Sequence, residues 1–217
     1  MPQHKFHSKQ KEFLNFLIKG DHAACSKIAQ DILNTSTLNN LYEHILKKSL
    51  YDVGELWEYN KISVATEHLS SAIVETILNE FYSSIISKEK INKTVIVACV
   101  ENEFHQIGIK MINDIFEVNG WNSYFLGANT PTNELIAYAK NIKTDMIAIS
   151  LSIYFHLPIL EKMIQQIRKE FPVLPILVGG QGFRHGGKNI LLKYNNVIYK
   201  PDLKNTELFI KKRNKNG

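Results

Sequence analysis

Cysteine is scarce in this sequence, with only two among 217 residues. Cys25 and Cys99 lie in apolar segments and show no CxxC spacing. The chain therefore lacks the paired thiols of a disulfide framework or a zinc ribbon. We interpret the two side chains as reduced thiols in the core of a cytoplasmic protein.

Long apolar runs and a strong charge of one sign are also missing. No apolar segment approaches the roughly 20 residues that cross a membrane, and the first residues, MPQHKFHSKQKE, lack the apolar core of a signal peptide. The net charge is only +5, and part of it lies in the tail 211–215. A few lysines at one end give weak attraction to phosphates. We expect a cytoplasmic protein that neither enters a membrane nor binds nucleic acid through its charge.

The first part of the chain, from about residue 8 to residue 88, has apolar residues at helical spacing. Gly20-Asp21, Thr35-Ser36-Thr37 and Ser63 provide the glycine and the capping residues that end or begin helices. Four helices with short connections favour an antiparallel bundle. Because the polar segment 87–90 has no apolar face, we place a helical-bundle domain at 1–88 and a linker at 89–93.

The second part alternates strand-like and helix-like segments, which is typical of a parallel sheet covered by helices on both faces. The sequence predicts an α + α/β protein, in which 94–217 is a flavodoxin-like (Rossmann-like) doubly wound domain with a five-stranded parallel sheet. In such a fold, ligands bind beyond the carboxyl ends of the strands. The predicted strands are 94–100, 122–126, 146–151, 175–178 and 197–199, and the predicted helices are about 105–119, 132–141, 157–170 and 206–213.

Three of the segments that follow these strands contain polar or glycine residues in a regular spacing. They are Glu103-Phe104-His105-Gln106-Ile107-Gly108, Ser150-Leu151-Ser152 and Gly179-Gly180. A single histidine at the start of a helix is more often a surface or capping residue than a ligand. However, 41 positions (109–149) separate the first two segments and 26 positions (153–178) separate the last two, and agreement at both spacings favours a ligand site.

This pattern resembles the cobalamin-binding motif of the methionine-synthase and mutase type, Asp-x-His-x-x-Gly, then Ser-x-Thr/Leu/Val, then Gly-Gly. The resemblance implies that His105 is the lower axial ligand of cobalt and that Glu103 accepts a hydrogen bond from its second nitrogen, which fixes the tautomer. It implies that Ser150 holds the Glu103 carboxylate. Further cofactor contacts are implied for Ser152, Gly108, Gly179 and Gly180, the glycines leaving room for the cofactor's nucleotide tail. Glu103 departs from the aspartate of the motif.

A second pattern lies in the helical part, where Trp57 is followed by nine residues and then by Glu67-His68. A core tryptophan with a solvated charge pair would explain it structurally. Beside the histidine motif, however, it resembles the light-sensing, adenosylcobalamin-binding proteins of the CarH/LitR type. That resemblance implies that Trp57 packs over the adenosyl group, on the upper face of the corrin, and that Glu67 and His68 contact it by hydrogen bonds, with Val64 in the same binding surface.

Two departures from that family concern how its members act after they sense light. Its members carry an N-terminal MerR-type DNA-binding domain, whereas this sequence begins almost directly with the bundle, so we do not expect direct DNA binding. In those proteins a histidine follows the tryptophan and captures cobalt after illumination, but Glu58 stands here. A carboxylate is a poorer cobalt ligand than imidazole.

The sequence leaves three functions open. The first is a light sensor or regulatory module that binds adenosylcobalamin (or another cobalamin), is not an enzyme, and acts through homo-oligomerisation or through a separate transcription regulator or signalling protein. The second is a corrinoid methyl carrier of a methyltransferase system, although an adenosyl pocket formed by Trp57 and Glu67-His68 argues against it. The third is an interaction protein that has lost its cofactor.

Overall fold

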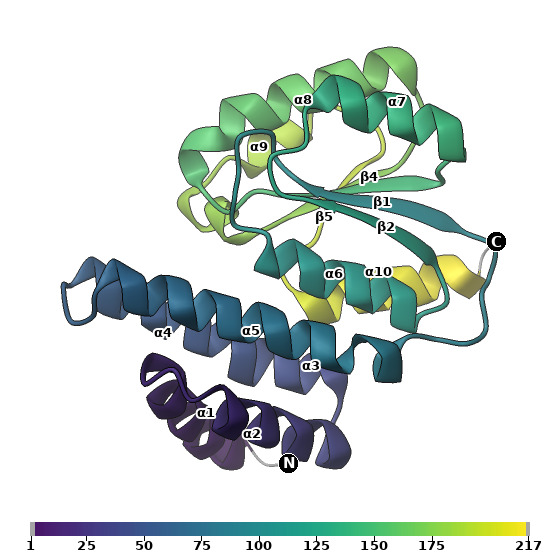
Figure 1. Cartoon of the computed structure of the whole chain (residues 1–217). Helices are drawn as coiled ribbons and strands as arrows, with labels where there is room; N and C mark the ends of the chain where they lie inside the picture. The colour runs from purple at the N-terminus through teal and green to yellow at the C-terminus, as the bar shows by residue number, and fades with distance from the viewer. Residues whose placement is uncertain (1–2, 216–217) are drawn as a thin grey trace. The chain divides into compact units, whose positions relative to one another are not determined.

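The computed structural model describes residues 3–215, which form two compact units that meet in sequence between Ser84 and Ile85. Figure 1 shows the helical unit in purple and blue and the α/β unit in teal to yellow. The division of the chain into domains 1–88 and 94–217 stays a prediction. Positions 1–2 and 216–217 of those ranges lie outside the described residues.

The helical unit begins its helices where the sequence predicts caps. Asp21 accepts a hydrogen bond from the Ala24 amide at 3.0 Å, and Ser63 accepts one from the Thr66 amide at 3.1 Å. Thr37 caps the third helix in the same way. Each bond satisfies an amide that has no partner inside its helix. The elements are α1 (Gln3–Ile18), α2 (His22–Thr35), α3 (Leu38–Asn40), η1 (Leu41–Leu46), α4 (Lys47–Glu58) and α5 (Val64–Ile85).

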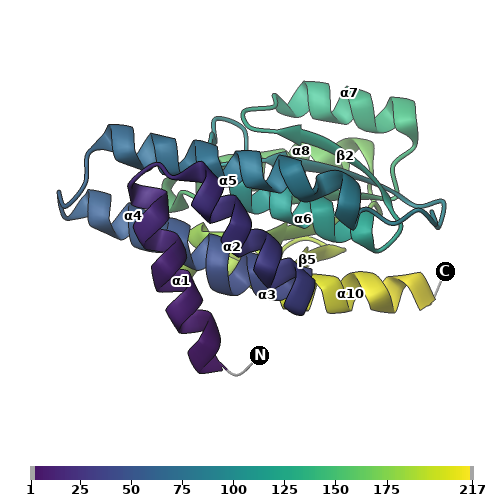
Figure 2. The ribbon, with the colours of Figure 1, turned by 60° about the horizontal axis from the view of Figure 1, so that its bottom comes forward.

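One feature of this unit is not predicted by the spacing of apolar residues. The segments α3, η1 and α4 follow one another without a break, and η1 is a π-helical turn. A π turn is wider than an α turn, and four of its side chains, Leu41, Tyr42, Ile45 and Leu46, are buried in the core. Four helical rods result, as predicted, and α4 and α5 form the hairpin visible in Figures 1 and 2.

The α/β unit contains the predicted five-stranded parallel sheet. The strand order is β2-β1-β3-β4-β5, with every neighbouring pair parallel, which confirms the doubly wound fold. Helices α7 and α8 cover one face of the sheet and α6 and α10 cover the other (Figure 1). The elements are β1 (Thr94–Cys99), α6 (Ile107–Val118), β2 (Asn122–Gly127), α7 (Thr132–Ile142), β3 (Met146–Ser150), η2 (Tyr154–His156), α8 (Leu157–Glu170), β4 (Ile176–Gly179), η3 (Gln181–His185), α9 (Lys188–Leu191), β5 (Val197–Tyr199) and α10 (Leu203–Lys215).

The order of strands places the site of interest at the carboxyl end of this sheet, between β1 and β3. From β1 the chain passes to β2 on one side, and from β2 it crosses to β3 on the other side of β1. At such a switch point the loops after the two neighbouring strands diverge and leave a crevice. The loops after β1 and β3 are the segments that contain Glu103, His105, Ser150 and Ser152.

Two helix boundaries differ from prediction. Helix α6 begins at Ile107 rather than near His105, because Asn102 adopts a left-handed conformation (φ +68°) and the Glu103 amide donates to the Val100 carbonyl in a turn. Helix α10 begins at Leu203 rather than Thr206, because Asp202 accepts a hydrogen bond from the Asn205 amide at 2.7 Å and caps the helix. The short elements η2, η3 and α9 are absent from the prediction, since single turns have no periodic pattern.

Among residues 3–215, no helix is both long and apolar enough to cross a membrane.

The buried cysteines provide a test of the two cores. Both thiols are free and buried, and burial raises the pKa of each to about 12, with a smaller contribution from the charge of Asp21 on Cys25 and of Glu103 on Cys99. Because the thiolate is the reactive form, we expect neither cysteine to react with Ellman's reagent in the folded protein at pH 8. Both should react in guanidinium chloride. Rapid labelling of the folded protein would contradict the structure.

Candidate functional site

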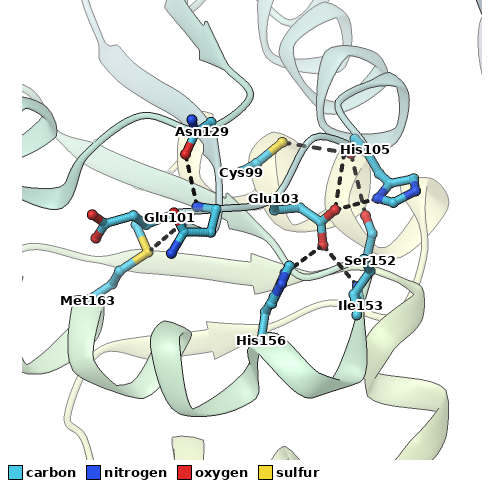
Figure 3. Close-up of polar contacts among 10 residues, drawn as sticks. Cys99, Glu101, Glu103, His105, Asn129, Ser152, Ile153, His156 and Met163 are labelled. Carbon is cyan, nitrogen blue, oxygen red and sulfur yellow. Dashed lines mark hydrogen bonds and ion pairs between the residues drawn. The ribbon is translucent and has the colours of Figure 1, made fainter.

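The loop after β1 turns one side chain inward and the next functional side chain outward. The turn at Asn102 buries the Glu103 carboxylate completely, at 0% exposure, whereas the His105 side chain is 62% exposed. Figure 3 shows both residues at the carboxyl end of the sheet, with the loop after β3 beside them. The site thus combines a buried anion with a histidine that faces outward.

Four donors surround the Glu103 carboxylate. Its Oε1 accepts hydrogen bonds from His105 Nδ1 and from the His105 amide, the latter at 3.2 Å. Its Oε2 accepts from the Ile153 amide at 2.9 Å and from His156 Nδ1 at 3.3 Å (Figure 3). An ionised carboxylate is an acceptor for about four hydrogen bonds. The buried charge is therefore fully satisfied by its surroundings.

These contacts determine the protonation of the pair. Burial alone would raise the pKa of Glu103, but the hydrogen bonds from the His105 side chain and from the His105 and Ile153 amides, with the charge of His105, outweigh it and lower the pKa to about 2. Glu103 is thus an anion that accepts hydrogen bonds, and His105 Nδ1 carries the proton between them. In a neutral imidazole of this tautomer, Nε2 bears the lone pair that binds a metal.

The serines of the motif lie near this pair in different roles. Ser152 Oγ donates a long hydrogen bond to the His105 carbonyl, at 3.4 Å. Ser150, the buried last residue of β3, was expected to hold the Glu103 carboxylate. Among the described residues no hydrogen bond joins the Ser150 hydroxyl to Glu103, and the role that the motif implies for Ser150 stays a prediction. The longer glutamate carries its Oε2 to the Ile153 amide and His156 instead.

The motif glycines have two different environments. A Cβ at Gly180 would lie 2.2 Å from the Leu151 carbonyl oxygen, and φ there is +112°. A Cβ at Gly179 would lie 2.8 Å from the Lys200 carbonyl oxygen. These two glycines are thus required by the close packing of the chain itself. A Cβ at Gly108 would meet no atom within 4 Å, so Gly108 faces open space in the first turn of α6.

Further polar contacts join the loops after β1 and β2, and sequence reasoning did not identify them. Gln106 accepts a hydrogen bond from the Ala128 amide at 3.2 Å. The Asn129 side chain accepts one from the Asn102 amide at 3.2 Å, and Thr132 donates to Glu101 at 2.7 Å. Asn102, at φ +68°, and Asn129, at φ +48°, carry a sequence signal, since asparagine tolerates the left-handed region. These contacts fix the loop that presents His105.

The residues predicted for the upper face of the corrin belong to the helical unit. Trp57, near the end of α4, is 48% exposed, and Val64, at the start of α5, is also exposed. Glu67 accepts hydrogen bonds from Ser71 at 3.1 Å and from His68 Nδ1 at 2.6 Å. The α4–α5 hairpin therefore presents an apolar ring and an oriented polar pair, in place of the core tryptophan of the structural alternative.

The donor set fits a corrinoid better than a free metal ion. Within residues 3–215, no group of three or more His, Cys, Asp and Glu side chains could hold a metal ion. A single histidine is a sufficient protein ligand when a macrocycle supplies the equatorial nitrogens. The exposed imidazole oriented by Glu103 and the open space at Gly108 meet the requirements of such a group.

Comparison with known proteins gives a consistent result. The model of a B12 binding domain family matches residues 93–199, and a second model, also described as a B12 binding domain, matches residues 9–81. Two curated relatives are the HTH-type transcriptional repressors CarA and CarH of Myxococcus xanthus. CarA is 25% identical over 130 residues (60% of this chain and 45% of CarA), and CarH is 24% identical over 166 residues (76% and 54%). The chain thus spans about half the length of these relatives.

Among solved structures, the monomethylamine corrinoid protein of Methanosarcina barkeri has the same fold. It superposes with a TM-score of 0.77 at 12% identity, over 94% of this chain and 98% of that chain. At this identity the likeness concerns the fold alone, and it includes both the helical and the α/β units.

Replacement of Glu103 by glutamine tests the buried anion. Because the pKa of Glu103 is lowered to about 2 from its ordinary value of 4.5, its ionised form stabilises the folded protein above pH 4.5, and this contribution is lost as the pH falls toward 2. We expect Glu103→Gln to lower the free energy of unfolding at pH 7 by about 1–3 kcal/mol. In urea titrations at several pH values, the difference in free energy of unfolding between the wild type and Glu103→Gln should become smaller in acid. A difference that does not change with pH would contradict the assignment of Glu103 as a buried anion.

Two glycine variants distinguish a glycine that the packing of the chain requires from one that leaves room for the cofactor. Gly180→Ala should destabilise the protein by about 1–3 kcal/mol, because alanine is strained at this φ and meets a carbonyl oxygen. Gly108→Ala should leave the stability of the cofactor-free protein unchanged or slightly raised, yet weaken cobalamin binding. Thermal unfolding and cobalamin titration measure the two effects. Unchanged cobalamin affinity in Gly108→Ala would place the cofactor elsewhere.

Proposed function

The chain belongs to the B12-binding domain family and takes cobalamin as its cofactor, and from this premise we propose that it is an adenosylcobalamin-dependent light sensor or regulatory module. In this proposal the chain is not an enzyme. Binding is His-on and base-off, with His105 below cobalt and with Trp57, Val64, Glu67 and His68 toward the upper ligand.

The exposure of Trp57 near the end of α4, with the Glu67-His68 pair in the first turns of α5, is the observation that carries this proposal. A large aromatic side chain that is 48% exposed leaves apolar area in contact with water, which is typical of a binding surface. An adenosyl group presents a flat base and ribose hydroxyls, which match an indole face and a carboxylate-imidazole pair. A methyl group is too small to cover the indole and offers no hydrogen-bonding group to Glu67 or His68.

The residues of the chain then convert loss of the upper ligand into a change of packing. When bound, adenosylcobalamin supplies a weak cobalt–carbon bond that light can break. Glu103 keeps His105 in place below cobalt in both states, because their hydrogen bond does not involve the upper ligand. Trp57 would lose its contact with the adenosyl group once light had broken the cobalt–carbon bond, and the exposed indole would then favour packing against a second copy of the chain or a separate regulator. This is a two-state element biased by a ligand.

The output differs from that of the related repressors. Glu58 stands where the CarH/LitR resemblance implies a second histidine ligand, so the proposal does not include capture of cobalt by the helical unit. The signal passes instead to a second copy of the chain or to a separate transcription regulator. Direct DNA binding is not part of the proposal.

Illumination of the reconstituted protein tests the light-sensing proposal. We expect the adenosylcobalamin-loaded protein to change its absorption spectrum and its molar mass or domain arrangement on illumination, as followed by light scattering and X-ray scattering. Trp57→Ala should bind adenosylcobalamin at least about tenfold more weakly, since it loses a buried aromatic contact, but should bind methylcobalamin as the wild type does. Tyr59→Ala, which removes a nearby exposed aromatic ring, is the control.

One outcome would contradict the light-sensing proposal. A protein whose spectrum changes in light while its assembly and domain arrangement stay the same would bind the cofactor without acting as a sensor.

A corrinoid methyl carrier is the second candidate, and one observation favours it. The fold match covers 98% of the monomethylamine corrinoid protein but the sequence matches only about half of each repressor. For a carrier, methylcobalamin would bind as tightly as adenosylcobalamin and Trp57→Ala would weaken neither. A partner methyltransferase would then transfer the methyl group. The ratio of the two affinities distinguishes the candidates.

A further inference from the structure

His156 is a second histidine at the buried carboxylate. It ends the short helix η2, in the connection from β3 to α8, and its side chain is 21% exposed. Its Nδ1 lies 3.3 Å from Glu103 Oε2, on the opposite side of the carboxylate from His105 (Figure 3). The cobalamin motif contains no residue at this position.

The side chain of His156 has no other structural task in its own helix. His156 is the residue before the first turn of α8, where a side chain often caps the helix, but it makes no capping hydrogen bond. Its ring turns instead toward Glu103. Because the ionised carboxylate only accepts hydrogen bonds, His156 Nδ1 carries a proton and donates it. The tautomer of His156 is thus fixed by the same anion that fixes the tautomer of His105.

The length of Glu103 makes this contact possible. An aspartate, as in the family motif, would place its carboxylate about 1.5 Å nearer to its own backbone and withdraw it from the β3–α8 connection. In this chain Glu103 Oε2 reaches that connection, where the Ile153 amide and His156 hold it and the Ser150 hydroxyl does not. The departure from aspartate and the presence of His156 are therefore parts of one arrangement.

We propose that His156 is a positioning residue for the cobalt ligand: it holds Glu103 Oε2, which orients the carboxylate plane and thereby the imidazole of His105. Both carboxylate oxygens, Cδ and Cγ of Glu103 lie in one plane, so fixing Oε2 also fixes the direction of Oε1. His105 Nδ1 follows Oε1, and Nε2 on the far side of the ring follows Nδ1. Partners of this kind typically change metal affinity by about 10-fold to 100-fold when they are removed.

The first test needs no cofactor. Nitrogen-15 NMR of histidine side chains in the cofactor-free protein should show both His105 and His156 as Nδ1–H tautomers. In Glu103→Gln, the His156 signal should shift toward the Nε2–H tautomer that free imidazole prefers. A His156 signal typical of the Nε2–H tautomer in the wild type would overturn the inference, because Nδ1 would then carry no proton to donate to Glu103.

The second test uses the cobalamin-loaded protein. We expect His156→Leu to lower the fraction of His-on cofactor, read from the absorption spectrum, and to lower cobalamin affinity about tenfold. His156→Asn, whose amide can replace the Nδ1–H donor, should restore binding to within about threefold. Lys162→Leu changes an exposed side chain of α8 and is the matched control, with wild-type behaviour expected.

A double-mutant cycle separates positioning from general stability. In a Glu103→Asp background the carboxylate no longer reaches His156, so adding His156→Leu should change affinity by less than about twofold. Equal losses in both backgrounds, or a wild-type spectrum for His156→Leu, would overturn the inference.

The inference rests on the proposed role of His105 as the cobalt ligand. The variant His105→Ala distinguishes failure of that ligand assignment from failure of the role proposed for His156. If His105→Ala has the wild-type spectrum, the ligand assignment itself is wrong. If His105→Ala loses the His-on spectrum while His156→Leu keeps it, the ligand assignment holds and only the role of His156 is wrong.

Discussion

The hydrogen bond between the buried Glu103 carboxylate and His105 is the contact on which the rest of this site depends. A completely buried carboxylate is tolerated only when its charge is paired and hydrogen-bonded, and four donors from two loops meet that condition here. The sheet order makes the meeting possible, because β1 and β3 are neighbours and their loops diverge from the same edge. The outward histidine is thereby held in one tautomer, with its second nitrogen directed away from the protein interior.

The same arrangement explains how a chain with no multidentate metal site among residues 3–215 serves a metal cofactor. Cobalamin takes its equatorial nitrogens from its own ring, so the protein has to supply one well-oriented axial ligand and space. Gly108 provides open space at the start of α6, whereas Gly179 and Gly180 allow the β4 loop to approach neighbouring backbone. Glycines of one motif thus perform different physical tasks, and the sequence motif does not distinguish them.

Periodicity and caps were sufficient to predict the five strands, their parallel arrangement and the four helical rods, because the spacing of apolar residues and the capping residues are local signals. The π turn at 41–46 and the short helices were not predictable in this way, since a single turn has no periodic pattern. The start of α6 at Ile107 was missed because the turn at Asn102 delays the helix. Spacing identified Glu103 and His105 as candidates, and the resemblance implied Ser150 as a partner of the carboxylate. The extra methylene of Glu103 moves that contact to Ile153 and His156, and no local pattern records such a change of partner.

The central claim is that His105 binds cobalt, and electron paramagnetic resonance tests it most directly. Cobalamin in the cobalt(II) state has an unpaired electron that couples to the axial nitrogen. In protein loaded with unlabelled cobalamin, labelling histidine with nitrogen-15 should convert the three-line splitting from nitrogen-14 into two lines, and His105→Ala should abolish that change. A splitting that does not respond to histidine labelling, or a two-line splitting that survives in labelled His105→Ala protein, would contradict the account.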